Sequence, residues 1–171
     1  MTDEVHVAFD ALVGELVSPL VVVTTAADGV RAGCLVGFHG QCGMEPRRYA
    51  VWLSKANRTY RVGMLSEVFA VHFLGRDDTA AAAHFGGETG DEVDTFAGWA
   101  WSGGEGGVPL LDACPNRIVG RRTALLDAGA DHVCVVLDPV AVTHEGLGGQ
   151  LSLADVVGLE PGHAATERQR P

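Results

Sequence analysis

Residues 31–59 read RAGCLVGFHGQCGMEPRRYAVWLSKANRT, and our interpretation of the chain starts from them. Two apolar segments typical of strands, 30–38 and 49–54, flank a middle that is interrupted by glycines. The stretch ends in Lys, Asn, Arg and Thr residues that open a helix. A bare backbone surface beside a positive helix start suits a planar ligand that carries a phosphate.

Positive charge is concentrated at the end of this stretch. Lys55 is the only lysine, and five of the twelve Lys and Arg residues lie within 47–61, although the net charge is −10. Asn57 has a side chain favoured at helix N-caps, so the first amides of the helix would lack partners within it and would attract anions. An ordinary capped, solvated helix start is the alternative interpretation. The residues of the predicted anion site are Lys55, Asn57, Arg58 and Thr59.

The rest of the chain predicts strands with a few short helices. We expect helices over 2–16, 58–65 and 79–85, and strands over 20–25, 30–38, 49–54, 68–74, 116–126 and 132–142. Residues 88–107 predict a long excursion, and 151–159 a last short element. Because the helices do not alternate regularly with the strands, the pattern favours a mainly β, α+β fold: an antiparallel barrel of about six strands with flanking helices. We expect one domain over 1–162 and a disordered tail over 163–171.

Composition excludes several classes of function. The acidic balance argues against nucleic acid as a partner, because a phosphate backbone calls for a broad basic surface. We find no apolar run long enough to span a bilayer and no secretory signal, so we expect a cytoplasmic protein without a membrane partner. In that reducing compartment the four cysteines should be free thiols that pack as small apolar groups: Cys34, Cys42, Cys114 and Cys134.

An ordered set of segments resembles a known family. PLVVVTT, ADG, AGCLVGFHGQCGMEP, YAVWLSKANRT, FAVHFL, HFGG, FAGWAW, VPLL and GADH follow one another as in the flavin reductase-like proteins with an FMN-binding split β-barrel. The resemblance covers nearly the whole chain. It implies a homodimer with FMN near the dimer interface and NADH or NADPH as the reductant. The reduced flavin would then pass electrons to free flavin, oxygen or a partner monooxygenase.

The resemblance also implies a set of site residues. The flavin-lining segment of the family falls on Leu35, Val36, Gly37, Phe38, His39, Gly40 and Gln41. Its phosphate and ribityl contacts fall on Lys55, Asn57, Arg58 and Thr59, which are also the residues of the anion prediction. The late Gly-Asp-His falls on Gly129, Asp131 and His132, near the reacting face of the flavin. We therefore predict a catalytic role for His132 in orienting or protonating a ligand; the alternative is a histidine that bonds its own turn.

The chain departs from the family within the flavin-lining segment. Relatives usually hold Ser and Thr hydroxyls there, at positions that in this chain are Leu35, Gly37, Phe38, Gly40 and Gln41. Two alternatives therefore stay open. One is a flavin-binding carrier or sensor without reductase activity. The other is a split barrel for the deazaflavin F420 or haem, with His39 or His132 as a possible iron ligand. FAD or F420 could also take the place of FMN as the cofactor.

Other residues have more than one interpretation. His39, Cys42 and Cys34 fall short of a tetrahedral ligand set, so we predict no metal site. Trp99 and Trp101 could stack on a ligand ring or anchor their own loop. Three arginines could bind a second phosphate or lie on the solvent face of a strand: Arg117, Arg121 and Arg122.

Overall fold

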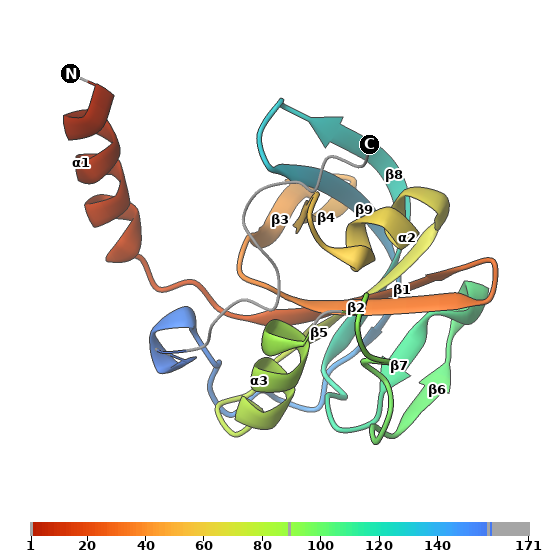
Figure 1. Cartoon of the computed structure of the whole chain (residues 1–171). Helices are drawn as coiled ribbons and strands as arrows, with labels where there is room; N and C mark the ends of the chain where they lie inside the picture. Colours follow the sequence, from red (N-terminus) through yellow and green to blue (C-terminus); the bar gives the residue numbers. More distant parts are fainter. Residues whose placement is uncertain (1, 89, 157, 159–171) are drawn as a thin grey trace.

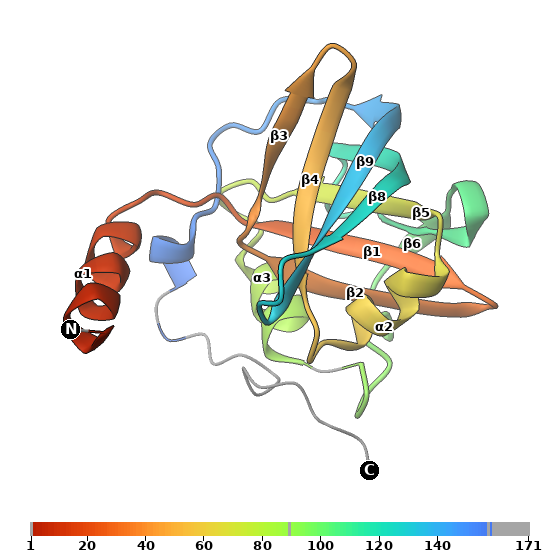
Figure 2. The same ribbon diagram turned by 90° about the horizontal axis from the view of Figure 1, so that it is seen from above.

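The computed structural model describes residues 2–88, 90–156 and 158. An antiparallel sheet of seven strands forms the body, in the order β2-β1-β5-β8-β9-β4-β3 (Figures 1 and 2). The strands are β1 (Val21–Ala27), β2 (Val30–Val36), β3 (His39–Met44), β4 (Arg47–Ser54), β5 (Val68–Phe73), β8 (Arg117–Asp127) and β9 (His132–Thr143). The chain passes from β2 directly into β3, and the Trp52 N–H donates to Phe38 O over 2.9 Å. The edge strands β2 and β3 are therefore joined at this corner. All neighbouring strands of the sheet are antiparallel, which confirms the predicted α+β architecture; the sheet has one more strand than expected.

Strand β1 is buried on both faces, as its β-branched run predicts. Val21 and Val23 point into the barrel interior with Phe69 and Leu137. The alternate side chains, with Val22 among them, point to a second core beneath helix α3 (Thr79–Gly87). The sheet therefore separates a barrel interior from a helix-covered core, and the start of helix α2 lies on the barrel side (Figure 1).

Helix α2 (Arg58–Leu65) has the predicted bounds and the predicted cap, because the Asn57 side chain accepts the Thr59 N–H over 2.9 Å. Helix α3 starts after Asp77 and Asp78, which the sequence suggests as a capped start, but no side-chain cap forms. Asp78 occupies the N-cap position, but its carboxylate accepts the N–H of Gly75 over 2.7 Å and not an amide of the helix.

Sequence patterns missed three strands. Residues 39–44, HGQCGM, form β3, which pairs with β4 and contains a bulge between Gln41 and Gly43. The expected excursion over 88–107 contains β6 (Trp101–Gly103) and the turn η1 (Glu105–Gly107), and β6 pairs with β7 (Pro109–Leu111). The last element is the short helix η2 (Leu153–Val156).

The aromatic residues of the excursion anchor it to the helix-covered core. Phe96 is buried against Phe85, and Trp99 packs on the same cluster. The Arg31 guanidinium lies over the Trp101 ring, 5.1 Å from its centroid. Of the two interpretations of Trp99 and Trp101, the structure supports loop anchoring.

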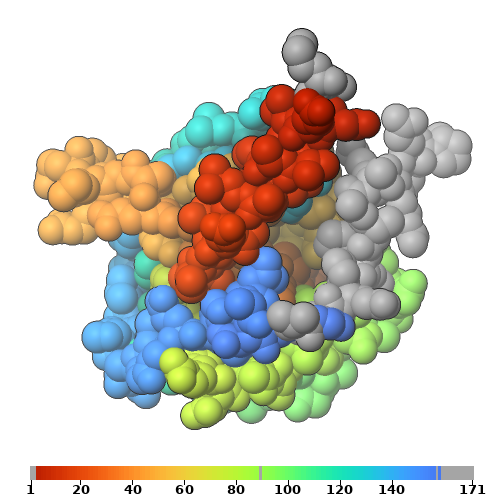
Figure 3. Space-filling model, turned by 90° about the vertical axis from the view of Figure 1, so that its left-hand side faces the viewer, coloured from red at the N-terminus to blue at the C-terminus, as the bar shows by residue number. Residues whose placement is uncertain are grey.

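Helix α1 (Thr2–Gly14) forms where predicted but stands apart from the sheet (Figures 1 and 2). Figure 3 looks onto α1, in red, from the side of the molecule on which it lies. Side chains 3–17 are all exposed, including the apolar stripe of Val5, Phe9, Leu12 and Leu16. The prediction of free cysteines is confirmed, but Cys42 is exposed and does not pack as a core residue. The predicted tail over 163–171 lies outside the described residues, and the single domain over 1–162 stays a prediction.

Candidate functional site

A cavity of about 320 Å³ opens at the corner where β2, β4 and β9 come together. One wall is the chain that leaves β2, and the opposite wall is the end of β4 with the turn before β9. The ring of Phe38 meets the His132 ring edge-on, with 5.2 Å between their centroids. The lining residues are Cys34, Leu35, Val36, Gly37, Phe38, Trp52, Ser54, Asn57, Asp131, His132 and Leu153. We call this space the corner cavity.

Six predicted site residues, far apart in the sequence, lie around the corner cavity. They are Leu35, Val36, Gly37, Phe38, Asn57 and His132. A Cβ atom at Gly37 would meet one neighbour, Leu20 Cδ2 at 3.8 Å, so this backbone is open to a ligand. Gly33 is different, because a Cβ there would approach Phe96 and Phe85 at 3.1 and 3.2 Å. The space beside Gly33 is therefore filled by the protein's own rings.

The remaining residues of the flavin-lining prediction do not line the corner cavity. His39 turns towards the core, where its Nδ1 lies 2.7 Å from the Tyr49 hydroxyl and its Nε2 lies 2.9 Å from Pro19 O. Burial lowers the pKa of His39, and the bond to Pro19 opposes this effect. Gln41 lies on the exposed β3–β4 hairpin and donates to Gly43 O. Gly40 lies on the same hairpin.

The start of α2 separates the corner cavity from a second cavity of about 420 Å³. The second cavity lies between β2, α2 and residues 90–95, and both Arg58 and Thr59 line it. Two of the amides that we expected to be free are already used: the Thr59 N–H bonds Asn57 Oδ1, and the Tyr60 N–H bonds Asn57 O. The amide part of the predicted anion site is therefore smaller than expected.

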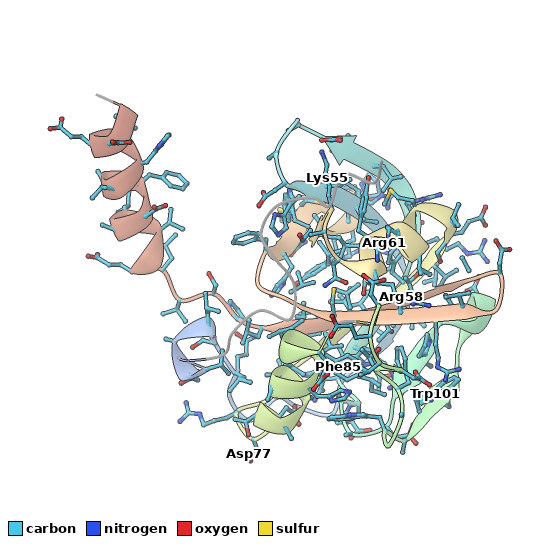
Figure 4. The ribbon with its side chains drawn as sticks, viewed as in Figure 1. Lys55, Arg58, Arg61, Asp77, Phe85 and Trp101 are labelled. Atoms are coloured by element: carbon cyan, nitrogen blue, oxygen red, sulfur yellow. The ribbon has the colours of Figure 1, made fainter. Side chains whose placement is uncertain are left out.

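The predicted cations are held by groups of the protein itself. Lys55 Nζ lies 2.9 Å from an Asp127 oxygen, and Arg61 lies 2.5 Å from Asp91. Arg58 donates to Gly90 O over 2.8 Å. Figure 4 shows the three cations around α2, and Phe85 and Trp101 lie on the other side of β1 and β2. An incoming anion at Lys55 would therefore have to compete with a carboxylate.

Hydrogen bonds and ion pairs also favour the charged forms of two carboxylates near the corner cavity, Asp127 and Asp131. The hydrogen bond from Lys55, together with the Gly129 N–H, lowers the pKa of Asp127. The bond between His132 Nδ1 and Asp131, 2.9 Å long, lowers the pKa of Asp131. Both carboxylates therefore stay ionised near neutral pH, and each orients the basic side chain that it contacts.

The three later arginines do not converge. Arg117 donates to Leu111 O, and Arg122 donates to the carbonyls of Gly63 and Met64 at the end of α2. Arg121 pairs with Glu105 on the exposed face of β8. Arg117 and Arg122 therefore hold neighbouring backbone in place, and Arg121 forms a surface ion pair. The three side chains do not come together as a second phosphate site.

Sequence reasoning missed two large side chains at the corner cavity. Trp52 alternates with the core residues Val51 and Leu53 on β4, so its outward position could have been inferred from the strand period. Leu153 comes from η2, which has no sequence signal that would place it beside β2.

Among the described residues, no group of three His, Cys, Asp or Glu side chains is placed to hold a metal ion. In the same part of the chain, no helix has the length and apolar character needed to cross a membrane.

The family model described as flavin reductase like domain matches residues 13–155. The chain belongs to this family. It is 30% identical over 129 residues to an FMN reductase (NADH), RutF 2 of Rhizobium rhizogenes, and the match covers 75% of this chain and 73% of that protein. It is 26% identical over 124 residues to the reductase subunit HsaB of a flavin-dependent monooxygenase from Rhodococcus jostii. That match covers 72% of this chain and 62% of HsaB, so this chain spans less than two thirds of the HsaB length.

Solved structures confirm the fold of this family member. The NADH:FAD oxidoreductase SgcE6 of Streptomyces globisporus superposes with a TM-score of 0.72 at 21% identity, over 81% of this chain and 82% of that one. An FMN-binding protein from Thermus thermophilus superposes with a TM-score of 0.70, also at 21% identity, over 77% of this chain and 72% of that one. At these identities the likeness establishes the split-barrel architecture.

His72 is a fully buried titratable group that lies away from both cavities. Its Nδ1 lies 3.1 Å from Cys114 O, and its Nε2 lies 3.3 Å from the Thr24 hydroxyl, which itself donates to Pro109 O. Burial lowers the pKa of His72 to about 4; the bond to Cys114 opposes this effect and the charge of Arg117 adds to it. The imidazole therefore folds in its neutral form, which agrees with the structural role that its strand position indicates.

The pKa of His72 predicts an acid-sensitive core. The unfolded chain binds a proton near the ordinary pKa of 6.5 and the native state only near 4, so stability is complete above pH 6.5 and falls as the pH drops towards 4. Between pH 7 and pH 4 the free energy of unfolding should fall by about 3 kcal/mol more in the wild type than in His72→Gln. Urea unfolding at each pH measures this difference, with exposed His6→Gln as the control. Parallel pH profiles of wild type and His72→Gln would contradict the assignment.

Proposed function

We propose that this protein is an NADH-dependent flavin reductase that binds FMN or FAD with the ring in the corner cavity and the phosphate end at the start of α2. The observation that carries the proposal is that Leu35–Phe38, Asn57 and His132, named from family resemblance, gather around one cavity. The family match over 13–155 and the RutF 2 relative support the activity. The four free cysteines suit a reducing compartment, and we place the activity in the cytoplasm.

The chemistry of the corner cavity fits a flavin. Its volume lies within the range of small-molecule sites, and its walls are mainly apolar with a few polar groups at one end. Leu35, Val36 and the bare backbone of Gly37 offer a surface for a ring, and the side chains of Ser54, Asn57 and Asp131 can bond its polar edge. The Ser and Thr hydroxyls of relatives are replaced here by apolar contact and backbone groups.

The cationic end is suited to a phosphate that exchanges with a carboxylate. Lys55 Nζ, bonded to Asp127, belongs to the segment that joins β4 to α2, and Arg58 begins the helix. A phosphate at Lys55 would replace the Asp127 carboxylate as the partner of the ammonium group. Because the Lys55–Asp127 pair has to break before Lys55 can pair with the phosphate, we expect reversible binding of the flavin.

A bound flavin supplies the acceptor for hydride from NADH. The protein would bury one face of the ring, hold its phosphate and leave the other face open to the nicotinamide. We assign to His132 the catalytic role at this open face, because Asp131 engages its Nδ1 and Nε2 is then the nitrogen that meets a ligand. We further propose that the protein is a homodimer and that the reduced flavin serves a partner monooxygenase, as the HsaB relative suggests.

One alternative has a specific observation in its favour. The apolar lining at Leu35, Gly37 and Phe38 would suit a flavin carrier that lacks reductase activity. The haem alternative is weakened at His39, because both of its ring nitrogens already have partners, Tyr49 and Pro19.

The phosphate assignment predicts a selective loss of affinity. Lys55→Ala with Arg58→Ala should raise the Kd for FMN about 10- to 100-fold, because charged hydrogen bonds to the phosphate are lost. Riboflavin lacks the phosphate, so its Kd should not change. Flavin fluorescence titration measures both values, with Arg47→Ala plus Arg121→Ala as a control of equal charge. An equal loss for FMN and riboflavin, or no loss for FMN, would refute the assignment.

Anaerobic mixing with NADH tests the reductase activity. The yellow absorbance of the flavin-loaded protein should disappear at a rate on the order of 1–1,000 per second, far faster than free flavin with NADH. His132→Gln should slow this step about 100-fold while the Kd for flavin stays near its wild-type value. If the wild-type spectrum does not change, the protein is a carrier and the reductase proposal is wrong.

A further inference from the structure

The flavin ring and the phosphate at Lys55 leave most of the second cavity unused. This cavity, of about 420 Å³, is larger than the corner cavity and lies within the range of small-molecule sites. Val30 and Val93, which are 40% and 42% exposed, offer apolar contact in it. Its lining therefore suits a ligand that has both an apolar and a polar part. The charged lining residues are Arg31, Arg58, Asp91, Glu92 and Asp94.

Two polar side chains of the second cavity lack a strong hydrogen-bond partner. Among the described residues, the buried side-chain nitrogen and oxygen atoms without such a partner are Arg31 Nε and Thr59 Oγ1, and both residues line the second cavity. The Cys34 thiol interacts with the Thr59 side chain, but sulfur is a weak hydrogen-bond partner. Buried polar groups are normally paired, so two exceptions at one cavity point to a ligand with oxygen acceptors. Because both atoms are buried, a side-chain rotation has to bring them to that ligand.

The second cavity lies where a dinucleotide would continue. In the proposed function the ring occupies the corner cavity and its phosphate lies at the start of α2, which is also the boundary between the two cavities. Lys55 and Arg58 are three residues apart, so their Cα atoms are separated by at most about 11 Å. Arg58 donates to Gly90 O through one nitrogen, and its guanidinium has further N–H groups to donate. Two successive phosphates can therefore each meet a cation, and the group beyond them enters the second cavity.

We propose that the second cavity binds the adenosine 5′-phosphate half of a dinucleotide. The phosphate lies at Arg58, the ribose hydroxyls donate to carboxylates within residues 91–94, and the base lies against Val30 and Val93. FAD and NADH both carry this group, and the continuity of the two cavities favours FAD. The choice between FAD and NADH rests on the proposed function, whereas the binding of the adenosine group does not.

The acidic side of the second cavity selects among adenosine phosphates. Asp94 lies 2.7 Å from Arg31, and Asp91 lies 2.5 Å from Arg61. Glu92 adds a third carboxylate to the lining. A ribose hydroxyl can donate to a carboxylate, whereas a phosphate on the 2′ oxygen is repelled by it. The second cavity should therefore accept the unmodified ribose of FAD or NADH and reject the 2′-phosphate of NADPH.

Nucleotide titration of the flavin-free full chain tests the site itself. AMP should shift the NMR signals of residues 29–33 and 90–95, and 2′,5′-ADP should bind at least about tenfold more weakly. If about 10 mM AMP shifts none of these signals, the proposal is wrong. Equal affinities for AMP and 2′,5′-ADP would overturn the selective role of the carboxylates. A protein that binds neither FMN nor FAD would refute the proposed function, and the AMP titration would still decide this site.

A bulky side chain in the second cavity identifies the source of the adenosine group. Val93→Trp narrows this cavity, and Val140→Trp is the matched control on β9, since the two valines are 42% and 43% exposed. If FAD is the source, Val93→Trp should raise its Kd at least about tenfold and leave the Kd for FMN unchanged. If NADH is the source, its KM in the FMN-loaded protein should rise instead.

Thermal unfolding and the FMN affinity verify that both variants fold. Val140→Trp should change neither the Kd for FAD nor the KM for NADH. If Val93→Trp also leaves both values unchanged, or if the two variants change them equally, the proposal is overturned.

Discussion

The junction between β4 and α2 is the constraint on which the site depends. The chain leaves β4 at Ser54, and four residues later it is helical, because the Asn57 side chain accepts the Thr59 N–H and its backbone N–H bonds Ser54 O. This cap fixes Lys55 between the strand and the helix. It also places Asn57 in the corner cavity and Thr59 in the second cavity. The Asn57 side chain thus fixes where the apolar wall of the corner cavity lies relative to the positive start of α2.

An acidic protein that binds an anion has to keep its cations apart from its own carboxylates or let them exchange. Here Lys55, Arg61 and Arg31 are paired with Asp127, Asp91 and Asp94. The pairs of Arg61 and Arg31 are exposed on both sides and contribute little to stability. The Lys55 side chain is only 14% exposed, so a phosphate that displaces Asp127 has to replace the lost ion pair. In the proposed function the same balance would limit the affinity for the phosphate. This suits a protein that takes up a flavin and releases it, better than one that holds a permanent prosthetic group.

The sequence correctly predicted those elements that are determined by residues close together in the chain. The N-cap at Asn57, the buried run of β1 and the alternation on β4 gave correct elements, and ordered motifs brought Leu35–Phe38 to His132. Strand β3 was missed because HGQCGM has little strand propensity, and its pairing with β4 holds it in place. The same pairing puts His39 on the core side, which spacing within a glycine-rich segment could not decide. Asp127 as the partner of Lys55 lies 72 residues away and follows from tertiary packing alone.

The central claim is that the corner cavity and the α2 start together hold one phosphorylated ring. A crystal structure of the protein with FMN tests this most directly. The account predicts the ring in the corner cavity against Leu35, Val36 and the Gly37 backbone, with the phosphate about 3 Å from Lys55 Nζ and the Asp127 carboxylate displaced. A ring bound elsewhere, or a phosphate that leaves the Lys55–Asp127 pair intact, would contradict it.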